Sequence, residues 1–513
     1  MKKKKNIAII DIGSNTIRLV IYQLNEQMVF TELQNIKLPV RLYQFLDEKK
    51  ELSPEGVYQL LRVMTLFQEI AHSYELEEMI TTATAVIRQS KNAPEILRTI
   101  EKKTGLTIRL LSENEEAYYG QYAIVRTTSF SEAYTVDMGG GSTEVTYFKD
   151  NEIIYSHSFP FGVVTLKQLF FNENFTNDEF AITQTKNYLK KQFASLPWLN
   201  DRNIPIVAIG GSSRNIATVH ERMTDFPVVG IHQYEMKKKD LKETLRLFTS
   251  LSFSELQSLD GLSKDRADII IPANLTFIAL MEQVHAPKFI FCNKGLREGL
   301  LMESVNQKYH ATYSPHHVAM TSIQRFVDTY QIDNYRAKKR TQIVDLLLNE
   351  IKQKQLLNEE IEQLIAYVSY GSQLYHIGSY IEEDNSAYHS FYLLANSNLN
   401  GFTHRERISL ALLASYKNKS LFKLFVKPFK QWFTEEELKY IRLAGSLIKF
   451  CEALNITTVN EIIDFSLQDE DTHFVLKAKW SFDPVAEEYR ANRQKKNLEH
   501  VLNKKVMIDF KKA

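Results

Sequence analysis

The stretch Y-T-V-D-M-G-G-G-S-T-E at residues 134–144 joins the end of an apolar strand to three consecutive glycines. Because glycine has no Cβ, successive backbone N–H groups at such a strand end can turn toward one point, and that concave backbone binds phosphate. Asp137 and Glu144 flank the glycines and offer hard carboxylate oxygens of the kind that Mg²⁺ prefers. Taken alone, the stretch is equally consistent with a glycine-rich hairpin turn whose two carboxylates are solvated.

A second copy of this pattern lies near the start of the chain. Residues 7–22 read I-A-I-I-D-I-G-S-N-T-I-R-L-V-I-Y, which is a buried strand, a turn that begins at Asp11, and a second strand. Asp11 and Asp137 are 126 residues apart, a separation of domain size. We therefore expect two similar halves that face each other across a cleft, with residues 13–16 on one wall and residues 139–143 on the other. Neither loop contains the lysine of a Walker A motif, which excludes a P-loop nucleotide triphosphatase.

Two charged residues between the loops are candidates for catalysis. Residues 79–92, M-I-T-T-A-T-A-V-I-R-Q-S-K-N, indicate a β-rich run with Arg88 at its polar exit. A guanidinium there could hold phosphate oxygens in a bidentate fork, and the alternative is an ordinary surface arginine. Ser112 is a natural N-cap, and Glu115, three residues later, completes a capping box and so has a structural role available. The capping box gives no such structural role to Glu116, the next residue.

The composition is that of a globular protein with several domains. The chain has 513 residues, of which 44% are hydrophobic and 24% charged, and this length predicts about three or four domains. Its net charge of +1 gives no overall attraction to nucleic acid or membranes, so any anion-binding surface must be local. Cys292 and Cys451 are the only cysteines, which argues against a disulfide scaffold and fits a reducing compartment. No apolar stretch reaches transmembrane length, and we expect a cytoplasmic protein.

With these motifs in view, the chain resembles the exopolyphosphatase/guanosine pentaphosphate phosphohydrolase family of the actin–hexokinase–Hsp70 superfamily. The resemblance is dense over residues 5–305. Eight segments carry it in order: D-I-G-S-N-T (11–16), T-A-V-I-R-Q-S-K-N (84–92), S-E-N-E-E-A (112–117), D-M-G-G-G-S-T-E (137–144), F-P-F-G-V-V-T-L (159–166), G-G-S-S-R-N (210–215), R-A-D-I-I-I-P-A (266–273) and G-L-R-E-G-L-L (295–301). It implies an α/β fold with two ribonuclease-H-like (actin-like ATPase) domains, residues 1–126 and 127–305, and an active-site cleft between them.

The resemblance also implies roles for individual residues. Glu116 is at the position that resembles the family's catalytic base for the attacking water, and Arg88 is at the position that resembles a second catalytic group. Asp137 and Glu144 are similar to the metal ligands, and Mg²⁺ or Mn²⁺ is the expected cofactor. The positions similar to phosphate-binding residues are Ser14, Asn15, Arg88, Gly140, Gly141, Ser142, Gly211 and Ser212.

The remainder of the chain has a helical pattern. Residues 389–407 resemble part of the all-α HD-like domain that follows the phosphatase core in long family members, and we expect that domain over residues 306–460. A small α+β segment is expected over residues 461–513, with a β-hairpin at 461–480 followed by a last helix and strand. The metal motif of HD domains would fall at residues 374–378, where Tyr375-His376 replaces a histidine followed by an acid. We therefore expect no catalytic metal there, and His376 to be a packed or surface residue.

Two basic segments lie in the C-terminal part of the chain. Residues 417–430 contain five lysines with no acidic residue between them, and phenylalanines interleave. Residues 490–505 contain further lysines and arginines. These segments are either the solvated faces of amphipathic helices or a track for a long polyanion. The residues of the predicted track are Lys417, Lys419, Lys423 and Lys427.

Together, the motifs and the resemblance predict an exopolyphosphatase that hydrolyses terminal phosphates of inorganic polyphosphate with a bound metal ion. One alternative is hydrolysis of guanosine pentaphosphate to tetraphosphate by the same chemistry. A second is a non-catalytic sensor of an alarmone or phosphate, and a kinase of the same superfamily is disfavoured by Glu116. We expect no nucleic-acid or membrane partner, and the resemblance implies a homodimer.

Overall fold

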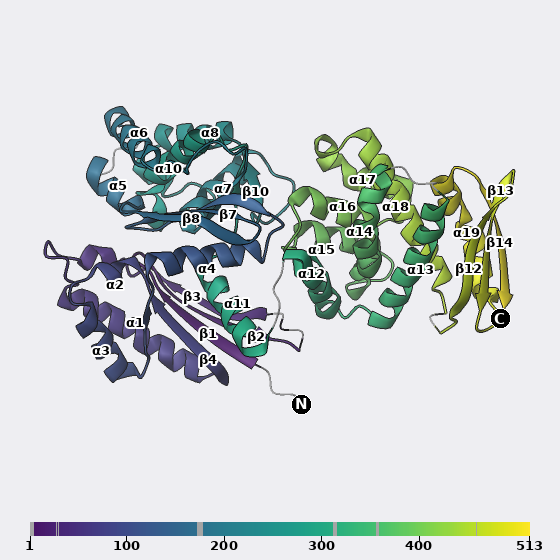
Figure 1. Cartoon of the computed structure of the whole chain (residues 1–513), viewed down its shortest axis with the longest axis horizontal. Helices are drawn as coiled ribbons and strands as arrows, with labels where there is room; N and C mark the ends of the chain where they lie inside the picture. The colour runs from purple at the N-terminus through teal and green to yellow at the C-terminus, as the bar shows by residue number, and fades with distance from the viewer. Residues whose placement is uncertain are drawn as a thin grey trace. The chain divides into compact units, whose positions relative to one another are not determined.

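The chain forms two compact units. In the computed structural model, the residues described are 5–26, 28, 30–171, 178–310, 315–354, 359–457 and 459–513. Unit 1 contains Met1–Phe226 and Ile231–Val318, and unit 2 contains Pro227–Gly230 and Ala319–Ala513. Figure 1 shows the helices and strands of both units and labels many of them.

The first sheet of unit 1 has five strands in the order β3-β2-β1-β4-β5. β1, β2 and β3 are antiparallel neighbours, whereas β4 is parallel to β1 and β5 is parallel to β4. β1 and β2 are almost continuously apolar, as expected for strands that are covered on both faces. The bounds are β1 Lys5–Ile12, β2 Ile17–Leu24, β3 Phe30–Leu38, β4 Leu76–Ala83 and β5 Arg109–Leu110.

Residues 79–92 differ from the β-rich run that the sequence predicts. β4 ends at Ala83, and Arg88 lies on a short helix, α2 (Ala85–Gln89). The apolar residues 85–87 are buried on this helix, so their hydrophobicity reflects core packing and not extension of the strand. Arg88 therefore projects from a helix that follows the strand and not from the strand end itself.

Helices cover both faces of the first sheet. One face packs against α1 (Pro54–His72) and α3 (Ala93–Thr104), and the other packs against α11 (Leu296–Tyr309). The domain range 127–305 predicted from the sequence assigns most of α11 to the second half of unit 1. In the structure, α11 instead joins the first sheet, because Leu300 and Leu301 form one buried cluster with Ile7 and Ile9.

The second sheet of unit 1 repeats the topology of the first. Its order is β10-β11-β9-β6-β7-β8, in which β6, β7 and β8 are antiparallel neighbours and β9 and β11 add parallel to β6. The series β8-β7-β6-β9-β11 therefore matches β3-β2-β1-β4-β5, which confirms the two similar halves predicted from the repeated motif. The bounds are β6 Glu132–Met138, β7 Thr143–Lys149, β8 Glu152–Phe159, β9 Ile206–Ile209, β10 Tyr234–Met236 and β11 Phe289–Phe291.

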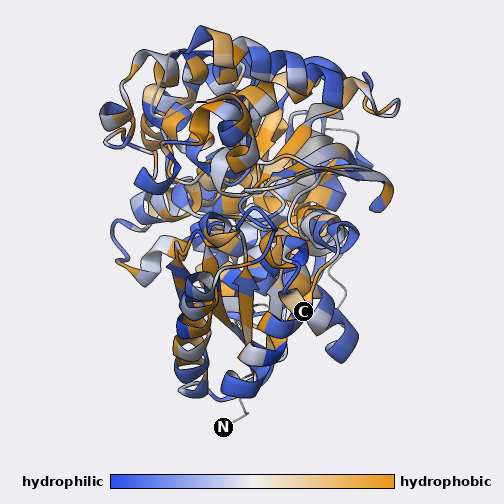
Figure 2. Ribbon diagram, turned by 90° about the vertical axis from the view of Figure 1, so that its left-hand side faces the viewer, coloured by the Kyte–Doolittle hydropathy of each residue, from blue (hydrophilic) through white to orange (hydrophobic). Residues whose placement is uncertain are grey.

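The second sheet packs against a group of helices that lie beside it in Figure 1. α10 (Ile270–Val284) is almost entirely buried and is the centre of that layer, with Phe277 packed on Phe289 of β11. Hydrophobic segments lie inside and hydrophilic helical turns outside in Figure 2. The other helices of this half are α5 (Val163–Phe170), α6 (Glu179–Ala194), α7 (Gly211–Met223), α8 (Lys238–Ser250) and α9 (Phe253–Leu256).

Helix α4 (Glu113–Val125) connects the two halves of unit 1. Its first turn carries the predicted capping box, in which Ser112 and Glu115 exchange hydrogen bonds. Near its C-terminus, Ile124 and Val125 pack with Ile209 and Phe148 of the second sheet. Because the helix is held at both ends, Glu116 has a fixed position between the two halves.

Unit 2 consists of helices followed by a small sheet. The helices are α12 (Pro315–Thr329), α13 (Asn334–Gln353), α14 (Glu359–Leu374), α15 (Ser386–Asn396), α16 (His404–Ala414), α17 (Lys419–Val426) and α18 (Glu435–Leu454). The hairpin predicted for residues 461–480 is present as β12 (Ile462–Asp469) and β13 (His473–Trp480). The predicted last helix and strand are α19 (Val485–Leu502) and β14 (Lys505–Lys512), and β14 pairs parallel to β13.

Short 3₁₀ helices complete the fold: η1 (Leu42–Phe45), η2 (Lys264–Arg266), η3 (Ile377–Tyr380) and η4 (Lys427–Trp432). His376 precedes η3, and its Nδ1 lies 2.9 Å from the hydroxyl of Ser386. Burial lowers the pKa of His376, so its imidazole is neutral at pH 7.

Among the described residues, no helix is both long enough and apolar enough to cross a membrane.

Candidate active site

The two glycine-containing loops share an equivalent backbone hydrogen bond. The amide of Gly13 donates to the carbonyl of Thr16 at 3.0 Å, and the amide of Gly139 donates to the carbonyl of Ser142 at 3.0 Å. In each half, the aspartate two residues before the glycine is paired across the hairpin, Asp11 with Arg18 and Asp137 with Glu144. The sequence repeat therefore corresponds to two equivalent hairpins, one in each half of unit 1.

The two loops approach each other so closely that side chains are restricted. A Cβ on Gly140 would lie 3.2 Å from the Cβ of Ser14, which is closer than most such contacts. Gly162, in the segment between β8 and α5, packs on the second loop, and a Cβ there would lie 2.5 Å from the carbonyl oxygen of Gly139. The amide of Val163 donates to that same carbonyl at 3.0 Å. Gly162 is a residue that our sequence analysis quoted within a motif but gave no role.

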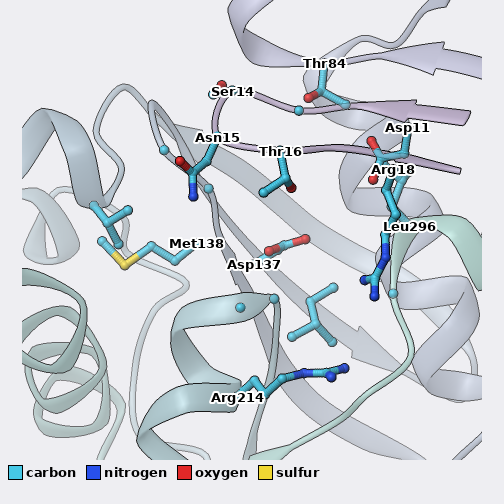
Figure 3. Close-up of a pocket in the computed structure, with 18 of the residues that line it drawn as sticks. Asp11, Ser14, Asn15, Thr16, Arg18, Thr84, Asp137, Met138, Arg214 and Leu296 are labelled. Atoms are coloured by element: carbon cyan, nitrogen blue, oxygen red, sulfur yellow. The ribbon is translucent and has the colours of Figure 1, made fainter. Parts of the chain in front are cut away.

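A cavity of about 360 Å³ lies between the loops. Its lining includes eight of the predicted site residues, namely Ser14, Asn15, Glu116, Asp137, Gly140, Ser142, Glu144 and Gly211. The amide side chain of Asn15 points into it in Figure 3, and its buried Nδ2 donates no hydrogen bond within the described residues. A buried amide without a partner indicates a missing acceptor, and a ligand oxygen can supply one.

Three of the predicted phosphate-binding residues do not line the cavity. Gly141 faces the side chain of Gln89, which lies 3.8 Å from the position of a Cβ. The hydroxyl of Ser212 accepts a hydrogen bond from Nη1 of Arg266 at 3.0 Å. Arg88 is the third, and it forms an ion pair with Glu116.

Asp137 and Glu144 lie on the same face of the sheet, because they are directly opposite each other in the β6–β7 ladder. The Ser158 hydroxyl donates to Glu144 at 3.0 Å, whereas the carboxylate of Asp137 receives no hydrogen bond from the described residues. Burial raises the pKa of Asp137 to about 7, and the nearby carboxylates of Glu144 and Asp11 add to the shift. Burial likewise raises the pKa of Glu144.

This pair of carboxylates could hold a divalent metal ion. Buried carboxylates that repel one another are stabilised when a cation lies between them. The donors are hard oxygens, which suits Mg²⁺ or Mn²⁺, and the unpartnered oxygens of Asp137 are free to coordinate. The donor chemistry therefore fits the ion that the sequence predicts.

Glu116 projects from the first turn of α4 toward the same carboxylates. Its pKa is raised to about 8, chiefly by burial and next by the Glu144 carboxylate, while the Arg88 guanidinium opposes the shift. Nη1 of Arg88 donates to Glu116 and also to the carbonyl of Leu111 at 2.8 Å. Nη2 of Arg88 is buried and donates no hydrogen bond within the described residues. Arg88 thus orients Glu116 and keeps one donor unused.

Basic side chains make up much of the remaining lining. The cavity contains four acidic residues and six basic ones, and the basic residues are Arg18, Lys37, Arg214, Arg266, Lys294 and Arg297. Figure 3 shows Arg214 and Arg18 extending toward the cavity from opposite sides. Our sequence analysis assigned no role to any of the six. Three of them do lie within segments that carry the family resemblance, so the sequence could have pointed to them: Arg214 in 210–215, Arg266 in 266–273 and Arg297 in 295–301.

The N-terminus of α7 lines part of the cavity. Gly210 precedes the helix with a φ of 94°, a conformation that suits glycine, and a Cβ there would lie 2.8 Å from Oδ1 of Asp137. Gly211 is in direct contact with the guanidinium of Arg266. The helix therefore presents its first N–H groups to the cavity beside Asp137, which is an arrangement that binds phosphate.

Unit 2 contains a separate basic groove of about 550 Å³. Four of the lysines of residues 417–430 line it, namely Lys419, Lys423, Lys427 and Lys430, together with Lys439 and Arg442 of α18. Lys417 is not among the lining residues, and its Nζ lies 3.4 Å from the carbonyl of Asp384. The interleaved phenylalanines are buried, and Phe425 stacks on Phe391 with ring centroids 4.4 Å apart. The phenylalanines therefore hold the helix in place while the lysines face the groove.

Comparison with known proteins gives matches over both units. The model of the Ppx/GppA phosphatase family matches residues 20–308, and that of the Ppx/GppA phosphatase domain III matches residues 318–479. The crystal structure of the Aquifex aeolicus member of the Ppx/GppA family is 23% identical with a TM-score of 0.53, and the match covers 60% of this chain and 99% of that one. An exopolyphosphatase from Cytophaga hutchinsonii is 20% identical with a TM-score of 0.54, and the match covers 59% of this chain and 98% of that one. At these identities the solved structures establish the fold, which is of the actin-like ATPase type.

Proposed function

Because this chain belongs to the Ppx/GppA phosphatase family, we propose that it is a metal-dependent exopolyphosphatase that removes terminal phosphates from inorganic polyphosphate. The observation that carries the proposal is the cavity between the two loops, where four carboxylates and six basic side chains converge. Basic residues and loop amides suit a chain of phosphates, and buried carboxylates suit a metal ion and a general base.

Glu116 is the proposed general base. It is held in place by Arg88 and faces the carboxylates of the cavity, and unlike Glu115 it takes no part in the capping box of α4. A base works best when its pKa lies near the working pH, and the pKa of Glu116 is raised to about 8. In its deprotonated form, Glu116 accepts a proton from the water that attacks the terminal phosphorus.

Asp137 and Glu144 are the proposed ligands of Mg²⁺ or Mn²⁺. When bound there, the ion would neutralise phosphate oxygens and the charge that develops on them. Asp137 contributes a carboxylate to which no described residue donates a hydrogen bond, and Ser158 orients that of Glu144. Gly210 allows the N-terminus of α7 to approach Asp137, so the same point of the cavity receives both the carboxylate and helix N–H groups.

The loop amides and arginines are proposed to bind the phosphate chain. Ser14, Asn15, Gly140 and Ser142 place donors on both sides of the cavity, and Asn15 has an unused amide group aimed into it. Arg214, Arg266 and Arg297 carry planar guanidinium groups that match pairs of phosphate oxygens. Fixed donors that already point at the reacting group stabilise the transition state without reorganisation.

The basic groove of unit 2 is proposed as the contact for long polyphosphate. A cavity of about 360 Å³ holds only a few phosphates, so discrimination between long and short chains requires contacts elsewhere. Lys419, Lys423 and Lys427 supply three cations on one side of the groove, and Arg442 supplies another from α18. Several weak contacts on one polyanion slow its release between successive cuts.

The test is phosphate release by the purified chain from three substrates, namely long-chain polyphosphate, guanosine pentaphosphate and ATP, each with excess Mg²⁺. We expect release from polyphosphate to exceed that from the nucleotides at equal concentrations of terminal phosphate. Faster release from guanosine pentaphosphate would assign the alternative activity to the same cavity. Tight binding of either substrate without release would identify a sensor and overturn the proposal.

Two further properties, a cytoplasmic location and a homodimeric state, are part of the proposal. Cys292 and Cys451 are both buried and unpaired, which suits the reducing cytoplasm. We also propose a homodimer, which light scattering or sedimentation of the purified chain measures directly.

A further inference from the structure

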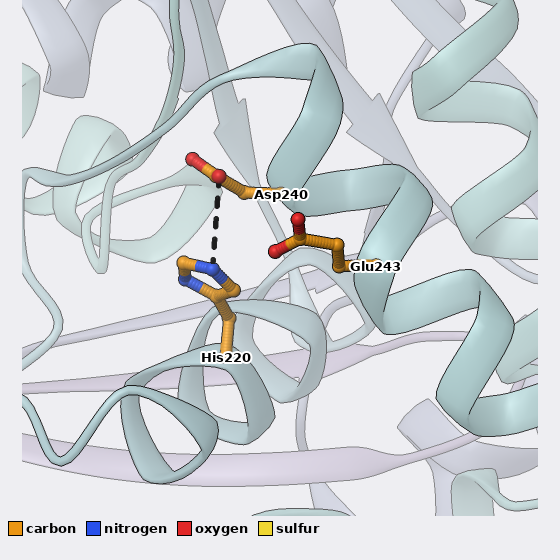
Figure 4. Close-up of side chains that lie close together, drawn as sticks. All are labelled: His220, Asp240 and Glu243. Atoms are coloured by element: carbon orange, nitrogen blue, oxygen red, sulfur yellow. Dashed lines mark ion pairs between the residues drawn. The ribbon is translucent and has the colours of Figure 1, made fainter.

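His220, Asp240 and Glu243 form a second polar cluster in unit 1, outside the cavity (Figure 4). Among the described residues, they alone form a group of three or more metal-ligating side chains whose ligand atoms lie within 4.8 Å of one another. His220 is on α7, and the two acids are three residues apart on α8. Side chains at that spacing lie on the same face of a helix, so α8 presents both carboxylates to the histidine.

The imidazole of His220 is held in an orientation that suits a metal ligand. Its side chain is 8% exposed, and Nδ1 lies 2.9 Å from the hydroxyl of Tyr234. Nε2 faces Oδ1 of Asp240 at 4.0 Å, which is too long for a hydrogen bond. Nε2 of this mostly buried side chain thus faces two carboxylates and forms no hydrogen bond among the described residues.

Asp240 is also oriented by the backbone. Its Oδ2 accepts the amide of Lys237 at 2.7 Å, as the third residue of α8, and Oδ1 is left facing His220. Glu243 lies one turn further along and is exposed, so the site is open to solvent on one side.

We propose that His220, Asp240 and Glu243 bind a divalent transition-metal ion, with Zn²⁺ as the best fit. Imidazole and carboxylate are both ligand types of Zn²⁺, and three protein ligands leave the fourth tetrahedral position open. Ligand atoms around tetrahedral Zn²⁺ are about 3.3–3.4 Å apart, so Nε2 and Oδ1 need to approach each other by only about 0.6 Å. Metal binding at Nε2 requires the proton on Nδ1, which then donates to Tyr234 as an outer partner.

The ion would tie the end of α7 to the beginning of α8. α7 starts at Gly211 in the cavity, and His220 lies nine residues further along, or about 14 Å. Occupancy stabilises the folded chain in proportion to the logarithm of the metal concentration. The site is thus distinct from the proposed Mg²⁺ site, whose ligands are carboxylates only.

The experiment is calorimetric titration of the full chain with Zn²⁺ in the presence of excess Mg²⁺, which occupies the carboxylates of the cavity. We expect one Zn²⁺ per chain. His220→Asn keeps a polar group at the place of Nδ1 and removes Nε2, and it is expected to weaken binding by more than the roughly 10–100-fold that loss of an outer partner costs. Glu243→Gln changes an exposed side chain, so it preserves folding and is expected to weaken binding as well.

The matched control is His285→Asn. His285 also faces an aspartate, with Nδ1 3.9 Å from Oδ2 of Asp201, but both side chains are more than half exposed and the pair belongs to no group of three ligands among the described residues. This variant is expected to bind Zn²⁺ as the wild type does. Equal Zn²⁺ affinity in wild type and His220→Asn would overturn the proposal. So would binding that persists in His220→Asn and disappears in Asp137→Asn, because it would place the ion in the cavity.

An independent readout is thermal unfolding with and without Zn²⁺. The unfolding midpoint of the wild type and of His285→Asn is expected to rise with Zn²⁺, while that of His220→Asn and Glu243→Gln is expected to rise much less. The same rise in all four proteins would contradict a site at His220.

Discussion

The guanidinium of Arg88 donates a hydrogen bond through Nη1 to the carboxylate of Glu116. From the sequence, the arginine is predicted to bind phosphate and the glutamate to act as the base for the attacking water. In the structure, Arg88 holds Glu116 in place, and its buried Nη2, which lies 3.7 Å from the Glu113 carboxylate, donates no hydrogen bond within the described residues. The proposed base and the proposed phosphate ligand are therefore joined by one hydrogen bond, and a change that breaks this bond is expected to affect both functions.

Replacing Glu116 by Gln is expected to abolish turnover while substrate binding is retained. Gln is isosteric and still accepts the hydrogen bond from Arg88, but it cannot accept a proton from water. General acid–base catalysis contributes about 10²–10⁴-fold, and we expect a loss in kcat of that size. Phosphate release and binding of labelled polyphosphate are the measurements. The control is Glu113→Gln on the same helix turn. Glu113 also faces Arg88, at 3.7 Å, but its side chain is half exposed and it is not the proposed base. Wild-type kcat in a folded Glu116→Gln protein would exclude Glu116 as the base.

Replacing Asp137 by Asn, or Glu144 by Gln, is expected to raise the Mg²⁺ concentration at which activity is half-maximal. Each change removes one charge from the pair that faces the cavity and leaves the strand pairing intact. The measurement is a titration of activity with Mg²⁺. Glu132→Gln, at the other end of β6, is the control, because Glu132 accepts from Tyr147 and does not line the cavity. An unchanged midpoint in either variant would rule out direct ligation by that residue.

The pH dependence of stability follows from the raised carboxylate pKa values. The pKa of Asp137 rises from 3.8 to about 7 and that of Glu116 from 4.5 to about 8, so the folded chain binds more protons than the unfolded chain between these limits. Without Mg²⁺, this part of the stability is fully present below the unfolded pKa values and is lost as pH rises through about 7 and 8. Urea unfolding from about pH 5 to about pH 8.5 is expected to show a decline that is smaller in Asp137→Asn. Mg²⁺ is expected to reverse the decline at the high end, because a cation favours the charged carboxylates. A decline of equal size in Asp137→Asn and wild type would contradict this origin.

Gly210→Ala is expected to impair both folding and activity. The φ of 94° at Gly210 is unfavourable for alanine, and the added Cβ would lie 2.8 Å from Oδ1 of Asp137. A residue held in such a conformation costs about 1–3 kcal/mol, and displacement of Asp137 adds a loss of activity. Gly105→Ala is the matched control, because Gly105 has a φ of 69° but no atom within 4 Å of the added Cβ. It is expected to lose stability and keep its activity. Full activity in Gly210→Ala would show that the position of Asp137 does not depend on Gly210.

Changing Lys419, Lys423 and Lys427 together to Ser is expected to raise the KM for long polyphosphate and to leave that for a short oligophosphate unchanged. Each exposed lysine contributes little alone, and the combined attraction fades as salt increases. Initial rates on both substrates at several salt concentrations are the measurement. The charge-matched control replaces Lys186, Lys190 and Lys191, which are exposed on α6 and line neither the cavity nor the groove. If both triple variants behave like the wild type, the groove lysines form a solvated helix face.

The sequence alone was sufficient to predict the repeated hairpin and the residues at its two loops. Glycine at a strand end and an aspartate two residues before it are local requirements, so they are readable in Asp11–Gly13 and Asp137–Gly139 without a structure. The capping box at Ser112 and Glu115 is equally local. These signals predicted the two halves and the cleft between them, whereas the role of Glu116 was implied only by the family resemblance.

Tertiary structure alone decided what depends on residues far apart in the chain. Arg297 and Asp11 form an ion pair at 2.9 Å across 286 residues, and α11 packs on β1 although the second half of unit 1 lies between them in sequence. The orientation of His220 toward α8 likewise depends on how two helices pack. Local sequence periodicity describes which face of an element is apolar, but it carries no information about which distant element covers that face. For that reason, the sequence predicted the two loops that we propose bind phosphate, while the basic lining, the pairing of Arg88 with Glu116 and the cluster at His220 became visible only in the folded chain.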